Sequence, residues 1–478
     1  MSDQLGTSDI ARLLGVSRPR VWQLRKDPTF PESAGRDEQG REYWYESQIL
    51  RWAATTKRDL AARAPLLFRP ASGQGAYYLG TSMVDGYVIL NWDSELGRIC
   101  FLYRPRGMEA GRIVHALNKL LPKTGADAMV GMDAGFHDAW GPELRAVDKA
   151  HPDRHYHPRW TDLAQLLGMP VPYWPSGLTI PREMARWRPG SPPLVLPPRH
   201  PALDTGPLLR LVSDSPDGST VAAAALELAR AIDAQAAMGA RSDIDLLDEA
   251  HDREAITLAA TLLQVEEAPD VEEYWLRDGW AQILKRTDRL AEDCVDLALR
   301  WNSGRYFPFS TPNHLDPERS AEAAEFISRL QPAERTAAAQ VFDDWTTAGY
   351  WTDPATDLPV ITTPEGEAWA ATPQRLPAQS PLHTVILRDQ QVWIRTSDGT
   401  LYLAPEDGDG LTWGYRGNGP TTLAMLLNRL LEDINAPAVR SLREEQPNPG
   451  LLRMAERVPQ DEGGVFTRDQ LISARNGN

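Results

Sequence analysis

The chain has only two cysteines among its 478 residues, Cys100 and Cys294, and they lie far apart in the sequence. Two such residues exclude a disulfide framework and a zinc site built from cysteines, so we expect a reducing, intracellular compartment. No apolar run approaches the ~18 residues that a membrane span needs. No charged and then apolar segment begins the chain either. We therefore expect a cytoplasmic protein with neither a signal peptide nor a membrane partner.

Lysine is also scarce, since only six lysines occur among the 50 Lys and Arg residues. With abundant Ala and Pro, this bias is typical of a GC-rich bacterial genome. Several catalytic patterns are missing: a Ser nucleophile elbow, HExxH, a Cys pair and a Rossmann glycine fingerprint. The sequence therefore predicts no catalytic residue and no cofactor.

Residues 7–55 carry the most informative pattern, which begins TSDIARLLGVSRPRVWQLRK. Apolar residues at helical spacing mark the inward faces of two short helices: Ile10, Leu13 and Leu14, then Val21 and Leu24. Gly15 ends the first helix, because glycine adopts the left-handed conformation of a sharp turn. Ser17 caps the second helix, and Pro19 occupies its first turn, where a missing N–H costs nothing. The pattern predicts a helix, a tight turn and a second helix.

A hairpin and a third helix follow this pair. Pro28 and Pro31 break the second helix, and residues 33–44 (SAGRDEQGREYW) predict a hairpin with its tip near Gly40. Residues 46–55 predict a last helix that packs through Ile49, Leu50, Trp52 and Ala53.

This arrangement resembles the small winged helix-turn-helix domains of the excisionase, AlpA and MerR type. The resemblance covers about residues 5–60 and rests on DIARLLGVSRPRVWQLR, the aromatic strand at 43–45 and ESQILRWAA. It implies that the second helix enters the major groove of double-stranded DNA and that the hairpin, or wing, touches the backbone or minor groove. The implied base-side positions are Arg18, Pro19, Trp22 and Gln23, and Ser17 is a further predicted DNA-binding residue. The implied phosphate-side positions are Arg20, Arg25, Lys26, Arg36 and Arg41.

The chemistry of the second helix also favours DNA. Arg bonds O6 and N7 of guanine together, and Gln pairs with the adenine edge. Residues 1–64 hold eleven Lys or Arg and nine Asp or Glu, a net charge of +2, so residues 65–478 carry −18 of the total of −16. Such an acidic body is repelled by DNA. Two points weigh against DNA binding. The acids Asp37, Glu38 and Glu42 oppose a phosphate contact by the hairpin. The alternative is a helix-turn-helix that serves only to pack against other protein.

Composition shifts divide the whole chain. The predicted fold class is multidomain α+β, with the N-terminal winged helix-turn-helix and with α/β units flanking a mostly helical middle region. The predicted parts are residues 1–64, the DNA-binding domain; 65–75, a linker; 76–168, an α/β domain; 169–217, a Pro-rich connector; 218–375, a mainly helical domain; 376–437, a small α/β unit; and 438–478, a polar, partly disordered tail.

Two finer patterns lie within these parts. Helical spacing predicts helices over 220–237, 243–264, 271–300 and 317–348, followed by a small hairpin over 349–375. The two α/β segments also share short spellings, a VIL strand at 88–90 and 385–387 and a helix with LNKLL at 117–121 or LNRLL at 427–431. These pairs suggest a divergent repeat.

Three segments could carry other chemistry, and each has a structural alternative. Asp133 follows a short strand, with His137 and Asp138 nearby and Asp93 in the neighbouring hairpin, so Asp93, Asp133 and His137 form a candidate Mg²⁺ site of a nuclease. The favoured alternative is a turn closed by Asp and Gly, because a metal pair needs more carboxylates than these.

The second segment is DKAHPDRHYHPRW, in which His151, His155 and His157 could bind a transition metal. Pro152 and Pro158 break any helix that would align these residues, so a surface loop is the favoured interpretation. The third segment is TWGYRGNGPTTL, whose Gly414, Gly417 and Gly419 precede a helix start that could hold an anion. A structural turn is favoured there. The turn resembles one in uncharacterised proteins of actinobacterial plasmids and phages, which implies no activity.

The leading hypothesis is a sequence-specific DNA-binding protein, associated with the nucleoid, that acts as a transcription regulator or as an accessory factor of a mobile element. Its acidic body would bind a protein partner, an effector or, as a homodimer through residues 76–437, a second copy. The alternative is a metal-dependent enzyme that processes nucleic acid and is targeted by the helix-turn-helix. The sequence predicts neither a catalytic residue nor a bound metal for the leading hypothesis.

Overall fold

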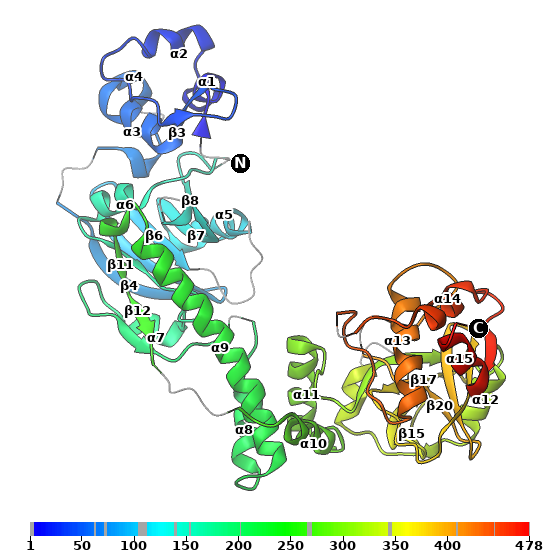
Figure 1. Ribbon diagram of the computed structural model, residues 1–478. Coiled ribbons are helices and arrows are strands. Elements are labelled where there is room, and N and C mark those ends of the chain that lie inside the picture. The colour runs from blue at the N-terminus through cyan, green and yellow to red at the C-terminus, as the bar shows by residue number, and fades with distance from the viewer. Residues whose placement is uncertain are drawn as a thin grey trace. The chain divides into compact units, whose positions relative to one another are not determined.

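The computed structural model describes residues 4–61, 64–70, 74–103, 112–137, 141–152, 154–200, 202–264, 270–342, 347–407, 410–443 and 445–477. The chain divides into two compact units, a first unit of residues 1–204 and 231–267 and a second unit of residues 205–230 and 268–478 (Figure 1). The division falls inside helix α9 (Thr220–Asp248). Both units combine helices and sheets, in agreement with a multidomain α+β class.

The chain begins with a small helical module, residues 4–61, here called the N-terminal module. Its elements are β1 (Gln4–Leu5), α1 (Thr7–Leu14), α2 (Arg18–Leu24), β2 (Gly35–Arg36), β3 (Glu42–Tyr45), α3 (Glu46–Thr56) and α4 (Arg58–Ala61). Gly15 ends α1 with a φ of 63°, the left-handed conformation expected of it. The buried side chains form one small core: Ile10, Leu14, Val21, Leu24, Trp44, Ile49 and Trp52.

A five-stranded sheet forms the centre of the first unit. Its strands are β4 (Tyr77–Val84), β5 (Tyr87–Ser94), β6 (Gly97–Tyr103), β7 (Ala128–His137) and β8 (Gly141–Asp148), in that order. Only β6 and β7 are parallel, because α5 (Ile113–Thr124) connects them. Side chains alternate across β5, so that Ile89 packs against α5 while Leu90 and Trp92 face the opposite core.

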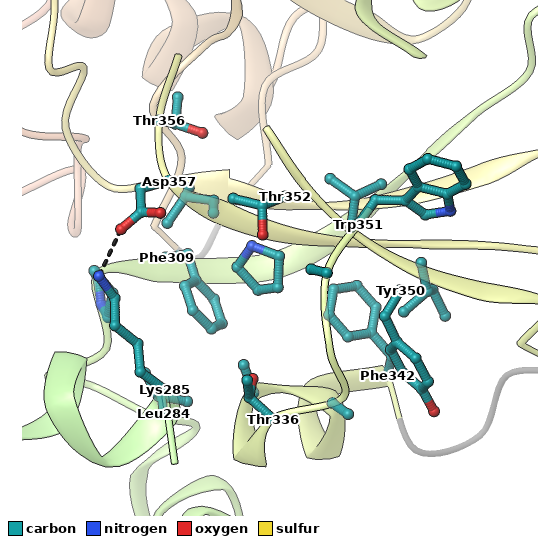
Figure 2. Close-up of a pocket in the computed structure, with 18 of the residues that line it drawn as sticks. Leu284, Lys285, Phe309, Thr336, Phe342, Tyr350, Trp351, Thr352, Thr356 and Asp357 are labelled. Atoms are coloured by element: carbon teal, nitrogen blue, oxygen red, sulfur yellow. Dashed lines mark hydrogen bonds and ion pairs between the residues drawn. The ribbon is translucent and has the colours of Figure 1, made fainter. Parts of the chain in front are cut away.

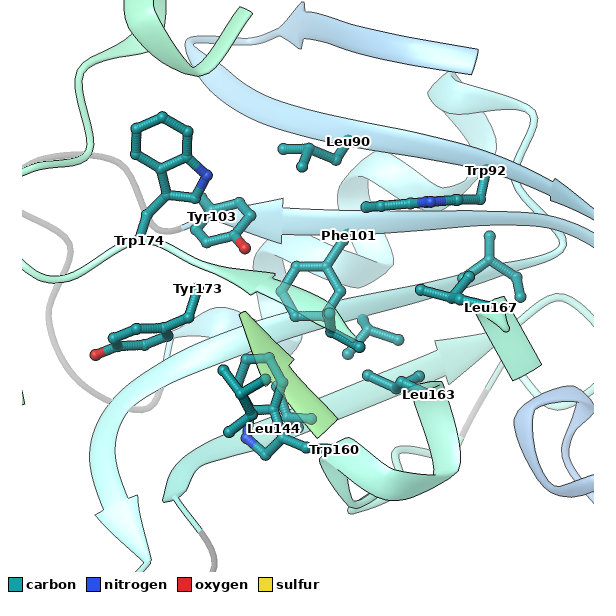
Figure 3. Close-up of a cluster of buried hydrophobic side chains, with 14 of the residues drawn as sticks. Leu90, Trp92, Phe101, Tyr103, Leu144, Trp160, Leu163, Leu167, Tyr173 and Trp174 are labelled. Atoms are coloured by element: carbon teal, nitrogen blue, oxygen red, sulfur yellow. The ribbon is translucent and has the colours of Figure 1, made fainter. Parts of the chain in front are cut away.

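The opposite face of the sheet carries the larger core of the first unit. Figure 3 shows Phe101 and Tyr103 of the sheet beside Trp160, Tyr173 and Trp174 from segments that follow it. Trp160 begins α6 (Trp160–Leu167), and its indole N–H donates to the carbonyl of Pro142 at 2.8 Å. The ring of Phe101 lies 5.9 Å from that of Trp160. Large aromatic side chains, which bury much apolar area each, are therefore prominent in this core.

Two segments predicted to be connectors belong to this core. In the predicted linker 65–75, residues Leu66–Phe68 form a buried 3-10 turn, and the N–H of Leu66 donates to Asp148 at 3.0 Å. In the first unit the Pro-rich segment 169–217 contains β9 (Val171–Tyr173), α7 (Pro181–Arg186) and β10 (Leu194–Leu196), while its last residues form α8 (Gly206–Asp214) in the second unit. Its Trp174 and Trp187 are buried. The predictions of a linker and of a connector were wrong, because apolar residues between the prolines and glycines of both segments are buried in the same core.

The helix predicted over 243–264 was also wrong beyond its first turn and a half. Helix α9 ends at Asp248, and residues 256–262 form β11 (Ile256–Leu258) and β12 (Ala260–Leu262). These strands pair in parallel with β9 and β10. Pairing with distant strands therefore overrode an Ala- and Leu-rich local preference for helix.

The second unit starts with helices and continues as a sheet, so the mainly helical domain predicted over 218–375 was wrong in its second half. The predicted helix 271–300 is two helices, α10 (Glu273–Leu284) and α11 (Arg289–Asn302). Where the structure describes the predicted helix 317–348, the helical parts are α12 (Ala321–Ser328) and the 3-10 helix η3 (Ala337–Phe342). The five antiparallel strands of the sheet are β13 (Phe309–Leu315), β17 (Ala368–Pro373), β16 (Leu358–Thr362), β15 (Gly349–Asp353) and β14 (Gln331–Pro332), in that order.

A second sheet packs on the first one within this unit. Its strands run in the order β20 (Leu401–Leu403), β19 (Gln391–Thr396), β18 (Leu382–Arg388) and β21 (Gly464–Thr467). Ile386 and Trp393 share a buried cluster with Val360 and Ala370 of the first sheet. Helix α13 (Asn418–Glu432) covers the other face. Among the described helices of the chain, none combines the length and the apolarity that a bilayer crossing requires.

The predicted disordered tail, residues 438–478, is folded where the structure describes it. It contains α14 (Pro449–Arg457), β21 and α15 (Arg468–Arg475), and β21 forms the edge of the second sheet beside β18. Leu451, Ala455 and Leu471 are fully buried against α13. Residues 438–478 are polar in overall composition, but their few apolar residues follow an amphipathic pattern and lie in the core.

Leu471→Ala tests this packing. The substitution should lower the free energy of unfolding by about 2–5 kcal/mol, because it removes a fully buried leucine and leaves a cavity. Val465→Ala, at a position 52 % exposed on β21, is the matched control and should change it by at most about 0.5 kcal/mol. Urea unfolding of the full chain measures both. Equal, small effects would contradict a folded tail.

Candidate nucleic-acid interface

Helix α2 is the element whose outward face the sequence assigns to DNA. Val21 and Leu24 point into the core of the N-terminal module, so the rest of the helix surface faces solvent. The predicted base-side residues are exposed, as is Ser17: Arg18, Pro19, Trp22 and Gln23. Ser17 occupies the N-cap position, but its side chain makes no capping hydrogen bond within the described residues.

The basic side chains of this face differ in whether they already pair with another group of the protein. Arg20 donates to the side-chain oxygen of Gln23 at 3.2 Å, which is a weak, exposed contact. The side chains of Arg18 and Lys26 make neither a hydrogen bond nor an ion pair with any described residue. Two exposed cations, Arg18 at the start of α2 and Lys26 just after its end, thus have no partner among the described residues, and an anionic ligand could pair with them.

Arg25 is not available in this way, although its position on the helix predicted a phosphate contact. Its guanidinium lies 4.7 Å from the ring centroid of Trp22 and 4.7 Å from that of Trp44, and it forms an ion pair with Glu42. The pair and the two rings hold its charge inside the module. The assignment of Arg25 to phosphate is therefore corrected: the residue joins α2 to β3.

The predicted hairpin contacts are also weakened by the structure. Arg41 pairs with Asp37 at 2.8 Å, and Arg36 donates to the carbonyl of Gly40 at 3.2 Å and lies 3.9 Å from Glu42. A hydrogen bond from the backbone N–H of Arg41 lowers the pKa of Asp37, so this acid stays ionised in the hairpin tip. Both arginines are exposed, but each lies beside a carboxylate that offsets its charge.

The N-terminal module is joined to the sheet of the first unit through α3. Leu50 is buried in the larger core of that unit. The carboxylate of Glu46 accepts from the backbone N–H of His157 at 2.9 Å and from its ring Nδ1 at 2.8 Å. Arg51 forms an ion pair with the nearly buried Asp162. Local sequence patterns do not predict that Glu46 contacts His157 or that Arg51 pairs with Asp162, because the partners lie more than a hundred residues apart in the chain.

The histidine segment takes part in this junction through His157. His151 bonds to Asp148 at 3.0 Å, and His157 bonds to Glu46. The rings of His155 and His157 lie 5.7 Å apart, and burial lowers the pKa of His155. No group of three potential ligands that could hold a metal ion occurs within the described side chains. Asp153 lies outside the described residues.

Strand register separates the carboxylates of the candidate nuclease site. Asp93 on β5 lies opposite Arg98 on β6, at the end of the sheet where β7 begins with Ala128. Asp133 lies five residues further along β7, or roughly 16 Å at about 3.3 Å per residue. Ligands of one Mg²⁺ lie about 2 Å from it, so Asp93 and Asp133 do not share an ion. The side chains of Asp133 and His137, and all of Asp138, lie outside the described part.

The glycine-rich turn before α13 is built by close packing. Gly414 has a φ of 88°, and a Cβ there would lie 3.0 Å from the carbonyl oxygen of Val458. A Cβ on Gly419 would lie 1.8 Å from the hydroxyl of Thr412. The N–H of Gly414 donates to Ala455 at 2.9 Å, which fastens the turn to α14. These contacts explain the glycines without an anion.

A cavity of about 340 Å³ lies in the second unit between η3, β15 and β16 (Figure 2). Phe309, Phe342 and Val360 contribute apolar walls, and Thr336 and Thr352 contribute hydroxyls. An ion pair between Lys285 and Asp357, 2.5 Å long, lies at one end. The volume is in the range of small-molecule sites, so this cavity is the candidate effector site of the body.

Comparison of this chain with known protein families, with curated proteins and with solved structures found no match.

Arg51→Ala tests the junction between α3 and the sheet. It leaves the carboxylate of Asp162 in a nearly dry site without its charged partner, so we expect a loss of about 1–3 kcal/mol in the free energy of unfolding. Arg12→Ala is the control, since Arg12 pairs with Asp9 at 3.5 Å on an exposed surface and should cost at most about 0.5 kcal/mol. Urea unfolding compares the two, and an equal cost would rule out a structural junction at Asp162.

Proposed function

We propose that the N-terminal module is a winged helix-turn-helix domain of the excisionase, AlpA and MerR type and that the chain is a sequence-specific double-stranded DNA-binding protein. The observation that carries this proposal is the exposed face of α2, where Arg18 and Lys26 have no partner among the described residues. A helix of this kind, with its other face in the module core, suits insertion into the major groove.

The exposed residues divide into two roles. Arg18 and Gln23 are the base-reading residues, because their side chains match the guanine and adenine edges. Arg20 and Lys26 hold phosphates, and Ser17 and Pro19 bring the start of the helix close to the groove. Arg36 and Arg41 remain secondary phosphate contacts, since each must first leave a neighbouring carboxylate.

The body of the protein remains attached to the proposed DNA-binding module. Residues 65–478 carry a net charge of −18, which opposes a broad DNA contact. The contacts of Leu50, Glu46 and Arg51 nevertheless hold the module on the sheet of the first unit. The body therefore stays near the DNA and acts by binding an effector or a protein there. A cytoplasmic, nucleoid-associated transcription regulator, or an accessory factor of a mobile element, fits this arrangement.

Substitutions on α2 test the proposal. In a duplex selected by the full chain from a random library, Arg18→Ala should cost about 1–3 kcal/mol and relax the preference at one base pair. Arg20→Ala should weaken all sequences alike and reduce the salt dependence of binding, because it removes a phosphate contact. Arg289→Ala is the charge-matched control, since Arg289 is also exposed but lies in the second unit. Unchanged binding in both α2 variants would refute the assignment.

Assembly follows from the small size of one module. A specific site needs about 4–10 kcal/mol beyond non-specific binding, commonly from two modules on half-sites one helical turn apart. We therefore propose that the chain dimerises through residues 76–437 and binds a repeated half-site. Light scattering at micromolar concentration should give twice the chain mass, and footprinting should protect two half-sites. A monomer that tightly protects one half-site without any partner would disprove this.

A further inference from the structure

Trp22 is held on the recognition face by a stack of three side chains. The innermost ring, Trp44, is buried, and its indole N–H donates to the carbonyl of Pro31 at 3.0 Å. The guanidinium carbon of Arg25 lies 4.7 Å from the centroid of this ring and 4.7 Å from that of Trp22, so Arg25 contacts both indoles. Glu42 pairs with Arg25 from β3. A fixed ring, a planar cation and a carboxylate therefore set the direction of Trp22.

The outermost ring of this stack stays largely in water. Trp22 is 56 % exposed, whereas Val21 and Leu24 already supply the buried face of α2. A single exposed aromatic residue is common on protein surfaces and needs no explanation by itself. Here, however, several residues fix the direction of a ring that contributes little to the core. The arrangement is that of a side chain prepared for a contact outside the protein.

The position of Trp22 on α2 identifies the kind of contact. Trp22 lies one turn after Arg18 on α2, and Lys26 follows just after the helix ends at Leu24, so Trp22 is on the face proposed above to enter the major groove. The major groove presents one apolar group, the 5-methyl group of thymine, and otherwise hydrogen-bonding edges. An exposed indole between two cations matches a thymine beside the bases and phosphates that those cations contact.

We propose that Trp22 is a specificity-determining residue that reads thymine through its 5-methyl group, and that Arg25 and Trp44 are positioning residues that aim it. This inference rests on the proposed DNA-binding function. It assigns to Arg25 a role that depends on its planar shape, because its charge is already paired with Glu42. Lysine would keep the charge but lose the stack.

The experiment uses the full chain and a duplex that it selects from a random library. Each thymine of that duplex is replaced in turn by uracil, which removes only the methyl group. At one position per half-site the wild-type protein should bind about three- to tenfold more weakly, the effect expected for one buried methyl group. In Trp22→Ala the same replacement should have no effect, since the contact is already lost.

Arg25→Lys separates positioning from phosphate binding. We expect it to reduce the uracil effect while leaving the salt dependence of binding unchanged. If Arg25 instead held a phosphate, the lysine variant would keep the uracil effect and Arg25→Ala would flatten the salt dependence. Trp22→Phe is the second variant, because it keeps a ring and should retain part of the uracil effect. Circular dichroism of each variant confirms that the module is folded.

The outcomes distinguish this inference from the proposed function. A wild-type protein that selects no sequence overturns both. A protein that selects a duplex but tolerates uracil at every thymine overturns only the role of Trp22. An undiminished uracil effect in Trp22→Ala also overturns it, because another residue would then read the methyl group.

Discussion

Helix α3 is buried on two sides, and the placement of the candidate interface depends on this double burial. Ile49 and Trp52 pack inside the N-terminal module, while Leu50 enters the core of the neighbouring sheet. Glu46, at the first turn of the helix, receives two hydrogen bonds from His157, so its buried charge is compensated. One helix thereby fixes both the inner packing of the module and its attachment. The exposed face of α2 is thus presented by a framework larger than the module alone.

The N-terminal module shows which parts of a site can be predicted from local sequence. The helices α1 and α2 lie where apolar spacing and Gly15 placed them, because both signals act within a few residues. The outward direction of Arg18 and Lys26 follows from the same spacing. The role of Arg25 does not, since spacing shows that a side chain points outward but not which distant residues await it. Trp44 and Glu42 reach Arg25 only after the hairpin folds back, seventeen or more residues later.

Further along the chain, strand pairing decided what local patterns could not. Ile256–Leu258 is Ala-flanked and reads as helix, yet it pairs with Val171–Tyr173. The predicted divergent repeat, with VIL at 88–90 and at 385–387, also shows that a local sequence pattern does not determine how a strand packs. The middle residue of the first VIL strand, Ile89, packs against its helix, whereas the flanking residues of the second, Val385 and Leu387, pack against theirs. The shared short sequence therefore places opposite faces of the two strands against their helices. The two strands do not correspond in register.

The parallel pairs β9–β11 and β10–β12 set an order of events during synthesis. Strands at 171–173 and 194–196 find their partners only at 256–262, after a long stretch of helix has been made. At roughly 5–20 residues per second this interval lasts several seconds. Throughout it the surroundings of Trp174 and Trp187 are incomplete, although both are buried in the finished unit. The nascent chain thus offers an apolar surface to chaperones, and a slower ribosome would prolong that exposure.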